Sequence, residues 1–251
     1  MIKIEKTKVY GFEEAIRGMR NPMNSWDRSD SDYRLILAAR CDDCEVFKNC
    51  EFDACEECEV NKILASNPDG YLVGPNDHEL MMKLVKAGTD HRKFLRMITV
   101  TCDITSPLYW WKEMDTYKIG TVSNSCSTMH KIAYKEFTLD DFSYEHLIAT
   151  DIDTENPRLV KTSMLFTLEG VICQLNYCRE KYLETNDKIW WWQMIQLLPS
   201  SYNQKRTLML NYEVIANMRK SRKNHKLDEW RDLITYFDKN LPYPELFTLE
   251  D

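Results

Sequence analysis

The chain has 251 residues, of which 43% are hydrophobic and 29% charged, an ordinary composition for a globular protein with a sizeable core. It has only 7 glycines and 8 prolines, which excludes collagen-like sequences and argues against a largely disordered chain. The formal net charge of −7 argues against a protein that holds duplex DNA along a broad basic face.

No segment of the sequence predicts contact with a membrane. A membrane-spanning helix needs about 18 consecutive apolar residues, whereas the densest apolar run is the short segment Ile189–Trp192. The N-terminus, MIKIEKTKVY, lacks the apolar stretch of a secretory signal. We therefore expect a cytoplasmic protein whose cysteines are reduced.

In the N-terminal part, residues 1–10 alternate weakly between apolar and polar side chains and predict a short strand. The apolar spacing of residues 11–20 predicts a helix that Asn21-Pro22 ends. Residues 40–60, RCDDCEVFKNCEFDACEECEV, differ in composition from the rest of the chain. We interpret this Cys-rich segment as an insertion into a single domain that spans residues 1–251.

The middle of the chain is more regular. Asn76 or Asp77 can begin a helix that Gly88 ends in the left-handed conformation. Residues 94–104 alternate and predict a half-buried strand.

Ser106-Pro107 predicts the start of the next helix, with a capping hydroxyl followed by proline at the first helical position. Gly120 ends this segment, and the Ser/Thr-rich residues 121–130 predict a loop.

The C-terminal half is mainly helical in pattern. Several segments have the spacing of amphipathic helices. They cover residues 138–148, 160–182, 187–197, 208–218 and 227–237. The sequence therefore predicts an α+β protein in which helices dominate.

Five of the 9 cysteines lie in the Cys-rich segment. Cys41 and Cys44 form one Cys-x2-Cys pair and Cys55 and Cys58 a second, and four thiolates suit a tetrahedral zinc ion. Acidic residues surround the thiols, so a bound cation would relieve their repulsion. Two other interpretations remain open: free thiols on an acidic loop, or an iron–sulfur or redox site that includes Cys50.

Three segments together resemble the flavin-dependent thymidylate synthases. These segments are the strand predicted at 94–104, SPLYWWKEMDTYK with TVSNSCSTMH, and LLPSSYNQKRTLMLNYEVIANMRKSRKNHKLDEW. The resemblance covers about residues 77–237. It lies more in the order of the predicted elements than in exact sequence motifs. It implies a small antiparallel sheet with long helices.

The resemblance also assigns site residues, with departures from the family pattern. Where the family has Arg-His-Arg, this chain has Thr116-Tyr117-Lys118 or Tyr117-Lys118-Ile119, and Met129-His130 replaces the terminal Arg-Tyr. By resemblance, Arg222 contacts the deoxyuridylate as the catalytic-site residue. The residues implied in cofactor or phosphate binding are Tyr117, Lys118, Asn124, Ser127 and His130.

The resemblance implies a homotetramer that binds FAD and transfers a one-carbon unit to dUMP or a related pyrimidine nucleotide. NADPH would supply the hydride and methylenetetrahydrofolate the carbon, as in a methyltransferase of nucleotide biosynthesis. Because the family's arginines are missing, the alternative is a catalytically degenerate nucleotide-binding or interaction protein on the same scaffold. The tryptophans at 110–111 and 190–192 favour core or interface packing over ligand contact.

Overall fold

A computed structural model of the chain describes residues 2–33, 67, 70–149 and 163–248. The four predicted zinc ligands, Cys41, Cys44, Cys55 and Cys58, lie outside these residues, as does Cys50. The chain folds as two compact units. The first unit is built mainly from Ile104–Thr116 and Asn124–Arg206, and the second from Ile4–Asp103, Tyr117–Ser123 and Thr207–Asp251.

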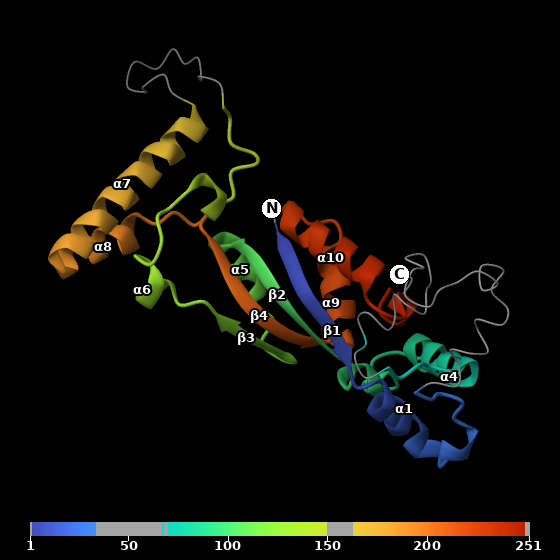
Figure 1. The fold of residues 1–251 in the computed structure, drawn as a ribbon. Coiled ribbons are helices and arrows are strands. Elements are labelled where there is room, and N and C mark those ends of the chain that lie inside the picture. Colours follow the sequence, from blue (N-terminus) through green and yellow to red (C-terminus); the bar gives the residue numbers. More distant parts are fainter. Residues whose placement is uncertain (1, 34–66, 68–69, 150–162, 249–251) are drawn as a thin grey trace, which may run out of the picture. The chain divides into compact units, whose positions relative to one another are not determined.

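A four-stranded antiparallel sheet confirms the predicted α+β class (Figure 1). Its strands lie in the order β1-β2-β4-β3. Their bounds are Lys3–Tyr10 for β1, Thr99–Pro107 for β2, Thr121–Ser125 for β3 and Asn203–Asn211 for β4.

Strand β2 alternates as its sequence predicts, with Val100, Cys102 and Ile104 fully buried. Burial, with the nearby carboxylate of Asp103, raises the pKa of the Cys102 thiol to about 12, so this cysteine acts as a small apolar side chain. The predicted start was wrong, because Lys93–Arg96 forms a 3-10 helix before the strand begins.

The helix after β2 begins later than its sequence signals predict. Helix α5 spans Leu108–Met114, and Ser106 is buried in the strand instead of capping the helix. The backbone N–H groups of Leu108 and Tyr109, which have no acceptor within the helix, donate to the carbonyls of Tyr202 and Ser200.

The described residues of the second unit form the helices α1 (Phe12–Arg20), α4 (Pro75–Lys86), α9 (Tyr212–Arg222) and α10 (Asp228–Asn240). The predictions of α1 and α10 are confirmed, as is the presence of α4. The predicted start of α4 was wrong, because Gly74 is the N-cap and Pro75 the first helical residue, instead of Asn76 or Asp77 capping the helix. Gly88 after α4 adopts the expected left-handed conformation, with φ of 100°. Two 3-10 turns, Asn21–Met23 and Trp26–Arg28, follow α1.

The C-terminal segment of the second unit, which includes the 3-10 turn Pro244–Leu246, completes the core of that unit. The Tyr243 hydroxyl accepts a hydrogen bond from the Val73 N–H at 2.9 Å, and the Tyr212 hydroxyl donates to the Pro242 carbonyl at 2.6 Å. Phe12 packs edge-on against Tyr243, with ring centroids 5.3 Å apart. The two ends of the described chain therefore share one apolar core.

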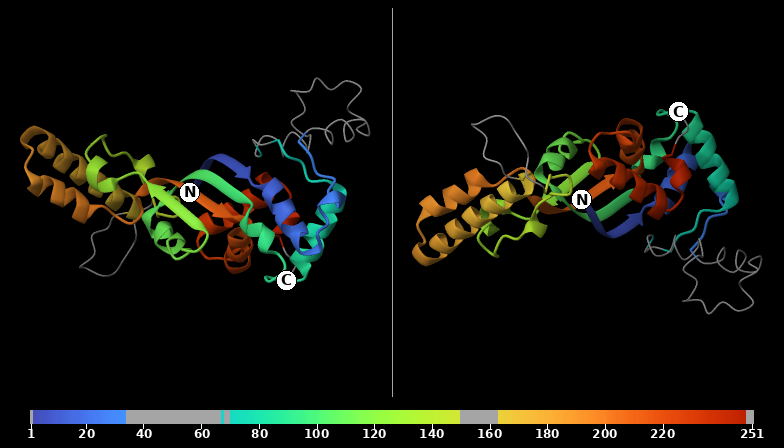
Figure 2. Two further views of the ribbon diagram at one scale, coloured as in Figure 1. Left: turned by 90° about the horizontal axis from the view of Figure 1, so that it is seen from below. Right: turned by 90° about the horizontal axis from the view of Figure 1, so that it is seen from above.

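The first unit contains helices α6 (Thr128–Lys131), α7 (Met164–Thr185) and α8 (Lys188–Leu197). Helices α7 and α8 lie side by side, and the predicted helical patterns of both are confirmed (Figure 2). The helix predicted over residues 138–148 is instead a single 3-10 turn, Leu139–Asp141, capped by Thr138. The residues that form the core of this unit are Ile132, Phe137, Phe142, Leu168, Ile172, Leu175, Cys178 and Met194.

The sequence pattern did not predict two of the strands, β4 and β3. Leu208 belongs to β4, and the next helix begins only at Tyr212, where the Asn211 side chain accepts a hydrogen bond from the Val214 N–H at 3.0 Å. Residues 121–125, predicted as loop, form β3. No helix of the described residues is long and apolar enough to span a membrane.

Candidate functional site

Arg222, the predicted catalytic-site residue, lies at the end of α9 in the second unit. Its guanidinium carbon is 4.8 Å from the ring centroid of Trp230, and its Nε donates a hydrogen bond to the Tyr117 hydroxyl at 3.1 Å. Trp230 is fully buried on α10 and gives the guanidinium a rigid surface. Two residues predicted as separate contacts, Arg222 and Tyr117, thus touch each other.

The chain between α9 and α10 keeps this cluster together. The His225 N–H donates to the Arg222 carbonyl at 3.0 Å, and His225 Nδ1 accepts from the Leu227 N–H at 3.2 Å. The His225 ring then lies 6.3 Å from the Trp230 ring. Glu229, in the first turn of α10, is also buried.

The groups of this cluster are of the kinds that bind anions. Arg222 is held by the Trp230 ring on one side and donates one hydrogen bond to the Tyr117 hydroxyl. A guanidinium stacked on an aromatic ring keeps its edge for planar hydrogen bonding to phosphate or carboxylate. Lys118, next to Tyr117, is exposed and makes no hydrogen bond or ion pair with the described residues.

A pocket of about 480 Å³ lies in the first unit. Ser127, a predicted site residue, lines it, whereas the predicted residues Asn124 and His130 do not. The other lining residues come from β2, from residues 126–141 and from β4 with the residue before it. They are Thr105, Cys126, Thr128, Lys131, Ile132, Tyr134, Lys135, Phe137, Asp141, Tyr202, Asn203, Gln204 and Lys205.

The loop that carries Ser127 is held by specific hydrogen bonds. Ser127 Oγ caps α6 by accepting from the His130 N–H at 3.2 Å. From β4, the Gln204 side-chain amide donates to the Cys126 carbonyl at 3.0 Å and to Thr128 Oγ1 at 3.1 Å. These contacts fix the hydroxyl groups of Ser127 and Thr128 at the pocket wall.

Three lysines line the same pocket, and sequence reasoning missed all of them. Lys131 lies with its ammonium nitrogen 5.5 Å from the Tyr134 ring centroid. Lys135 forms an ion pair with Asp141, and Lys205 follows Gln204 on β4. No local pattern signals this group, because Lys131 and Lys205 come together only in the folded chain.

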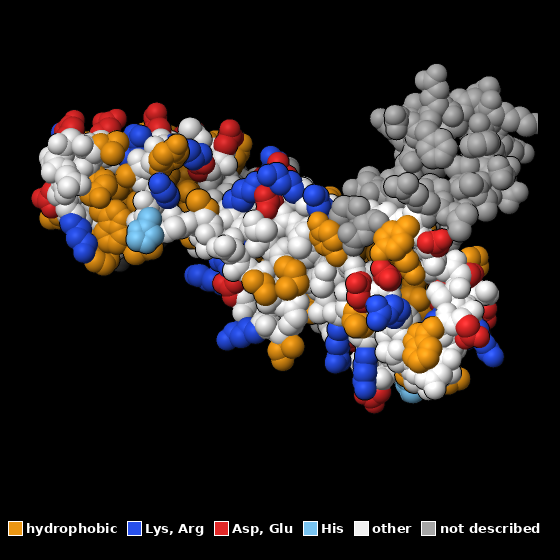
Figure 3. Space-filling model, turned by 60° about the horizontal axis from the view of Figure 1, so that its bottom comes forward, with side chains coloured by type: hydrophobic (Ala, Val, Ile, Leu, Met, Phe, Trp, Pro, Cys, Tyr) orange, Lys and Arg blue, Asp and Glu red, His pale blue; other side chains and the backbone are white. Residues whose placement is uncertain are grey.

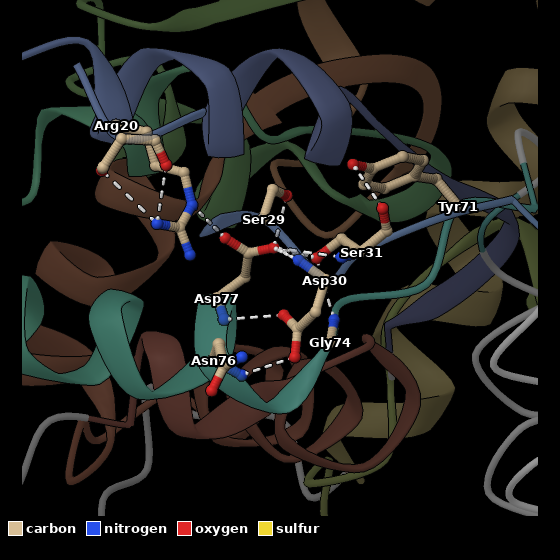
Figure 4. A network of polar contacts seen from close by, with 9 residues as sticks. Arg20, Ser29, Asp30, Ser31, Tyr71, Gly74, Asn76 and Asp77 are labelled. Carbon is tan, nitrogen blue, oxygen red and sulfur yellow. Dashed lines mark hydrogen bonds and ion pairs between the residues drawn. The ribbon is translucent and has the colours of Figure 1, made fainter. Parts of the chain in front are cut away.

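A second charged cluster of the second unit is a buried network around Asp77 (Figure 4). One carboxylate oxygen accepts from Arg20 Nε at 2.5 Å. The other oxygen accepts from the hydroxyl groups of Ser29 and Ser31 at 2.7 and 2.6 Å, and from two backbone N–H groups at 3.1 Å. Since both oxygens are engaged by the protein, this carboxylate holds the fold and offers little to a ligand.

The same network sets the start of α4. The Asp30 carboxylate accepts from the N–H groups of Asn76 and Asp77 at 2.9 and 3.1 Å (Figure 4). A Cβ atom at Gly74 would lie 2.3 Å from Asp30 Oδ1, so this position excludes any side chain. Asp30 therefore caps α4 from a distant part of the sequence.

Within the described residues, no group of three or more His, Cys, Asp or Glu side chains is arranged to hold a metal ion. Cys102 and Cys178 are buried, and Cys126 and Cys173 are exposed as free thiols. Trp110 and Trp111 are fully buried core residues, as the sequence favoured, whereas Trp192 is partly exposed.

The fold of this chain is that of the flavin-dependent thymidylate synthases and of a related nucleotide methylase. ThyX from Helicobacter pylori, a flavin-dependent thymidylate synthase complexed with FAD and dUMP, aligns over 98% of this chain and 97% of its own, with a TM-score of 0.60 and 16% identity. The UMP/dUMP methylase PolB from Streptomyces cacaoi, bound with 5-Br dUMP, aligns over 99% and 95%, with a TM-score of 0.51 and 14% identity.

A second structure of the Helicobacter pylori enzyme with FAD and dUMP gives a TM-score of 0.59 at 14% identity. No protein-family model and no curated protein sequence matches the chain. The resemblance predicted from the sequence is thus confirmed at the level of the fold.

Proposed function

We propose that the protein binds a pyrimidine nucleotide and methylates it reductively, with dUMP or a related uracil nucleotide as substrate. The observation that carries the proposal is the likeness over nearly the whole chain to three structures that hold dUMP or its bromo derivative. Methylenetetrahydrofolate would supply the carbon and NADPH the reducing equivalents. No protein nucleophile is needed, because the protein's part is to position and polarise the pyrimidine.

In this proposal Arg222 binds the nucleotide through its guanidinium group. Trp230 and Tyr117 hold the guanidinium in one orientation, which lowers the entropy lost when a ligand binds. A bidentate contact to phosphate is the interaction that this geometry favours.

The residues that the family resemblance assigns to cofactor binding have side chains that can bind the phosphates of FAD. Lys118 supplies an ammonium group, and Ser127 a hydroxyl whose proton can still be donated, both of which suit phosphates. Asn124 and His130 are exposed on either side of Ser127 and can add polar contacts. When bound, FAD would supply hydride transfer, while these side chains would bind and orient its phosphates.

The test of this proposal uses Arg222→Ala, with Arg222→Lys as the matched control. We expect Arg222→Ala to weaken dUMP binding by about tenfold or more, and Arg222→Lys to recover part of it, because lysine keeps the charge but loses the planar fork. Calorimetric titration with dUMP measures both. Equal dUMP affinity in Arg222→Ala and the wild type would remove this assignment.

An activity assay separates methylation from binding alone. The wild-type protein is expected to be yellow, with absorbance near about 450 nm from bound flavin, and to form the 5-methyl nucleotide when supplied with NADPH and methylenetetrahydrofolate. A colourless protein that binds dUMP without NADPH oxidation would instead identify the degenerate binding protein. The loss of the family's arginines, at 116 and 118 or at 117 and 119 and also at 129, favours that alternative.

We also propose that the protein assembles as a homotetramer. Hydrophobic side chains gather on the surface formed by α7 and α8 (Figure 3). The large apolar residues exposed on these helices are Met164, Phe166, Tyr177, Leu183, Ile189, Trp192 and Leu197. Exposed apolar area of this kind is typical of subunit interfaces. Light scattering after size-exclusion chromatography should give four times the monomer mass, and a monomer would contradict the proposal.

For the Cys-rich segment we propose a structural zinc ion bound by Cys41, Cys44, Cys55 and Cys58. Elemental analysis of the full chain should find about one zinc per chain, since a site of four thiolates is closed. Cys55→Ser/Cys58→Ser should lose this metal, whereas Cys173→Ser, which alters an exposed thiol of α7, should keep it. Less than half an equivalent of any metal in the wild type would contradict the proposed site, and only the interpretation as free thiols would remain.

A further inference from the structure

We propose that Gly120 is a positioning residue. It lets the turn between α5 and β3 lie against the start of α9, and the turn in that place holds the Tyr117 side chain on Arg222. The inference rests on the proposed function only in that Arg222 is taken to bind the nucleotide. Gly120 is not among the residues that the family resemblance assigns to the site, and its role follows from two contacts that the turn makes with one helix.

The turn is short and is held by its own contacts. It comprises residues 117–120 and leads directly into β3. The Thr121 hydroxyl donates a hydrogen bond to the Tyr117 carbonyl, which closes the turn. Gly120 has φ of 76°, in the left-handed region that favours glycine. Because the turn is closed and belongs to the same compact unit as α9, a displacement at one end of it also moves the other end.

At one end, the turn lies against the start of α9. A Cβ atom at Gly120 would lie 2.8 Å from Asn211 Nδ2 and 3.0 Å from Val214 Cγ2. The Asn211 side chain is not free to swing away, because its Oδ1 caps α9 by accepting from the Val214 N–H at 3.0 Å. Val214 is itself buried. A side chain at position 120 would therefore push the turn away from α9.

At the other end, the turn contacts the last residue of α9. The Tyr117 hydroxyl accepts from Arg222 Nε at 3.1 Å, and the guanidinium carbon of Arg222 lies 5.8 Å from the centroid of the Tyr117 ring. The Trp230 ring lies 5.8 Å from the Tyr117 ring with an angle of 56° between the planes, so the guanidinium lies against two rings. Trp230 is fixed in the core of the unit, whereas Tyr117 is half-buried and is carried by the turn.

The place of the turn therefore sets how firmly Arg222 is held. A hydrogen bond weakens steeply when its distance or angle departs from the preferred geometry, so a small shift of Tyr117 is enough to weaken this one. Arg222 would keep its contact with Trp230 but would lose an anchor. A ligand that binds the guanidinium would then have to restrict more side-chain motion. Gly120 thus raises the affinity for an anion without touching it.

The experiment compares Gly120→Ala with the matched control Gly88→Ala. Gly88 has φ of 100°, so both substitutions strain the backbone in the left-handed region, but a Cβ atom at Gly88 would meet no atom within 4 Å. Phenylglyoxal, a reagent that modifies arginine side chains, reports the accessibility of Arg222 when the modified peptide is measured by mass spectrometry. This measurement needs no nucleotide, and circular dichroism checks that both variants keep the fold.

Arg222 should react about threefold faster or more in Gly120→Ala than in the wild type, and within about twofold of the wild-type rate in Gly88→Ala. An unchanged rate in Gly120→Ala would overturn the proposal. So would equal increases in the two variants, because backbone strain and not the contact with α9 would then explain the change.

Two further variants separate positioning from a general structural role. In a Tyr117→Ala background, Gly120→Ala should add no further increase in the rate, since both changes act through one contact. Asn211→Ser keeps a capping hydroxyl but removes the amide nitrogen, so adding it to Gly120→Ala should restore part of the wild-type rate. Fully additive rates with Tyr117→Ala, or no recovery with Asn211→Ser, would overturn the proposed route from Gly120 to Arg222.

Calorimetric titration with dUMP separates this inference from the proposed function. Gly120→Ala should bind dUMP about threefold more weakly than Gly88→Ala, or weaker still. Faster modification of Arg222 with unchanged dUMP affinity would support the positioning role of Gly120 and contradict the role of Arg222 in nucleotide binding. No binding of dUMP by the wild type would contradict the proposed function, while the modification rates would still support or overturn the role of Gly120.

Discussion

Two arginines of the second unit show how differently the same side chain can be used. Arg20 is buried, with 4% of its surface exposed, and its Nε donates to the fully buried carboxylate of Asp77. Arg222 is partly exposed, lies flat on the Trp230 ring and donates to a neutral phenol. The first arginine is paired with a buried carboxylate, whereas the second is held at the surface by an aromatic ring and a phenol.

The comparison teaches that the environment of a charged group distinguishes a structural from a binding role. A buried ion pair stabilises a fold only when its other hydrogen-bonding groups are satisfied, which the Ser29 and Ser31 contacts to Asp77 achieve. A cation stacked on an aromatic ring is oriented by the ring, which leaves the edge of a guanidinium facing outward. Substitution should therefore affect stability in the first case and affinity in the second.

The largest effect is expected for Asp77→Ala. This change leaves Arg20 as a buried charge without its carboxylate and removes the acceptor of the two serine hydroxyls, so the free energy of unfolding should fall by about 3–5 kcal/mol. Arg20→Met should cost less, because Asp77 keeps its other four donors. Urea unfolding measures the free energy of unfolding of both variants. A decrease below about 1 kcal/mol for Asp77→Ala would contradict the structural role of the Arg20–Asp77 pair.

A pH dependence follows from the same carboxylate. Burial alone would raise the pKa of Asp77, but hydrogen bonds from Ser31, Ser29 and Arg20 outweigh it and hold the pKa below its usual value. The stabilisation is therefore fully present above the unfolded pKa of about 3.9 and is lost as the pH falls through the lower folded pKa.

Asp77→Asn provides the measurement, because asparagine has the same shape without the charge. The difference in the free energy of unfolding between wild type and Asp77→Asn should stay constant from about pH 5 to 8 and shrink below about pH 4. A difference that does not change with pH down to the acid transition would show that the charge of Asp77 contributes nothing.

The smallest effect is expected for Tyr117→Phe, which removes only the acceptor of the Arg222 hydrogen bond. One such bond contributes about 1 kcal/mol, so dUMP affinity should fall by about two- to fivefold with little change in stability. Calorimetric titration of Tyr117→Phe and Arg222→Ala with dUMP compares the affinities of the two variants. A loss as large as that of Arg222→Ala would mean that the phenol contacts the ligand directly.

The helices were largely predictable from the sequence because their signals are local. Helix α1 buries Phe12, Ala15, Ile16 and Met19 at helical spacing, and α8 ends where Leu198-Pro199 predicts. Strand β4 was missed because Leu208 also fits the spacing of the helix that follows, although Asn211 is a typical N-cap residue. Strand β3 was missed because it is an exposed edge strand, rich in Ser and Thr, without apolar alternation.

The site was predictable only in part. The family resemblance pointed to Arg222, Tyr117 and Ser127, but the contact between Arg222 and Tyr117 joins positions 105 residues apart. Lys131 on α6 and Lys205 on β4 line one pocket although they are far apart in the sequence. Long-range contacts of this kind depend on the tertiary fold, so spacing along the chain does not reveal them.

The contact of Phe12 with Tyr243 has a consequence for how the protein is made. During synthesis at about 5–20 residues per second, Tyr243 is added roughly 12 to 46 seconds after Phe12. Until then the apolar face of α1 lacks this partner, and a nascent chain in that state is a target for chaperones and proteases. Slower translation should lengthen this vulnerable interval for the N-terminal helix.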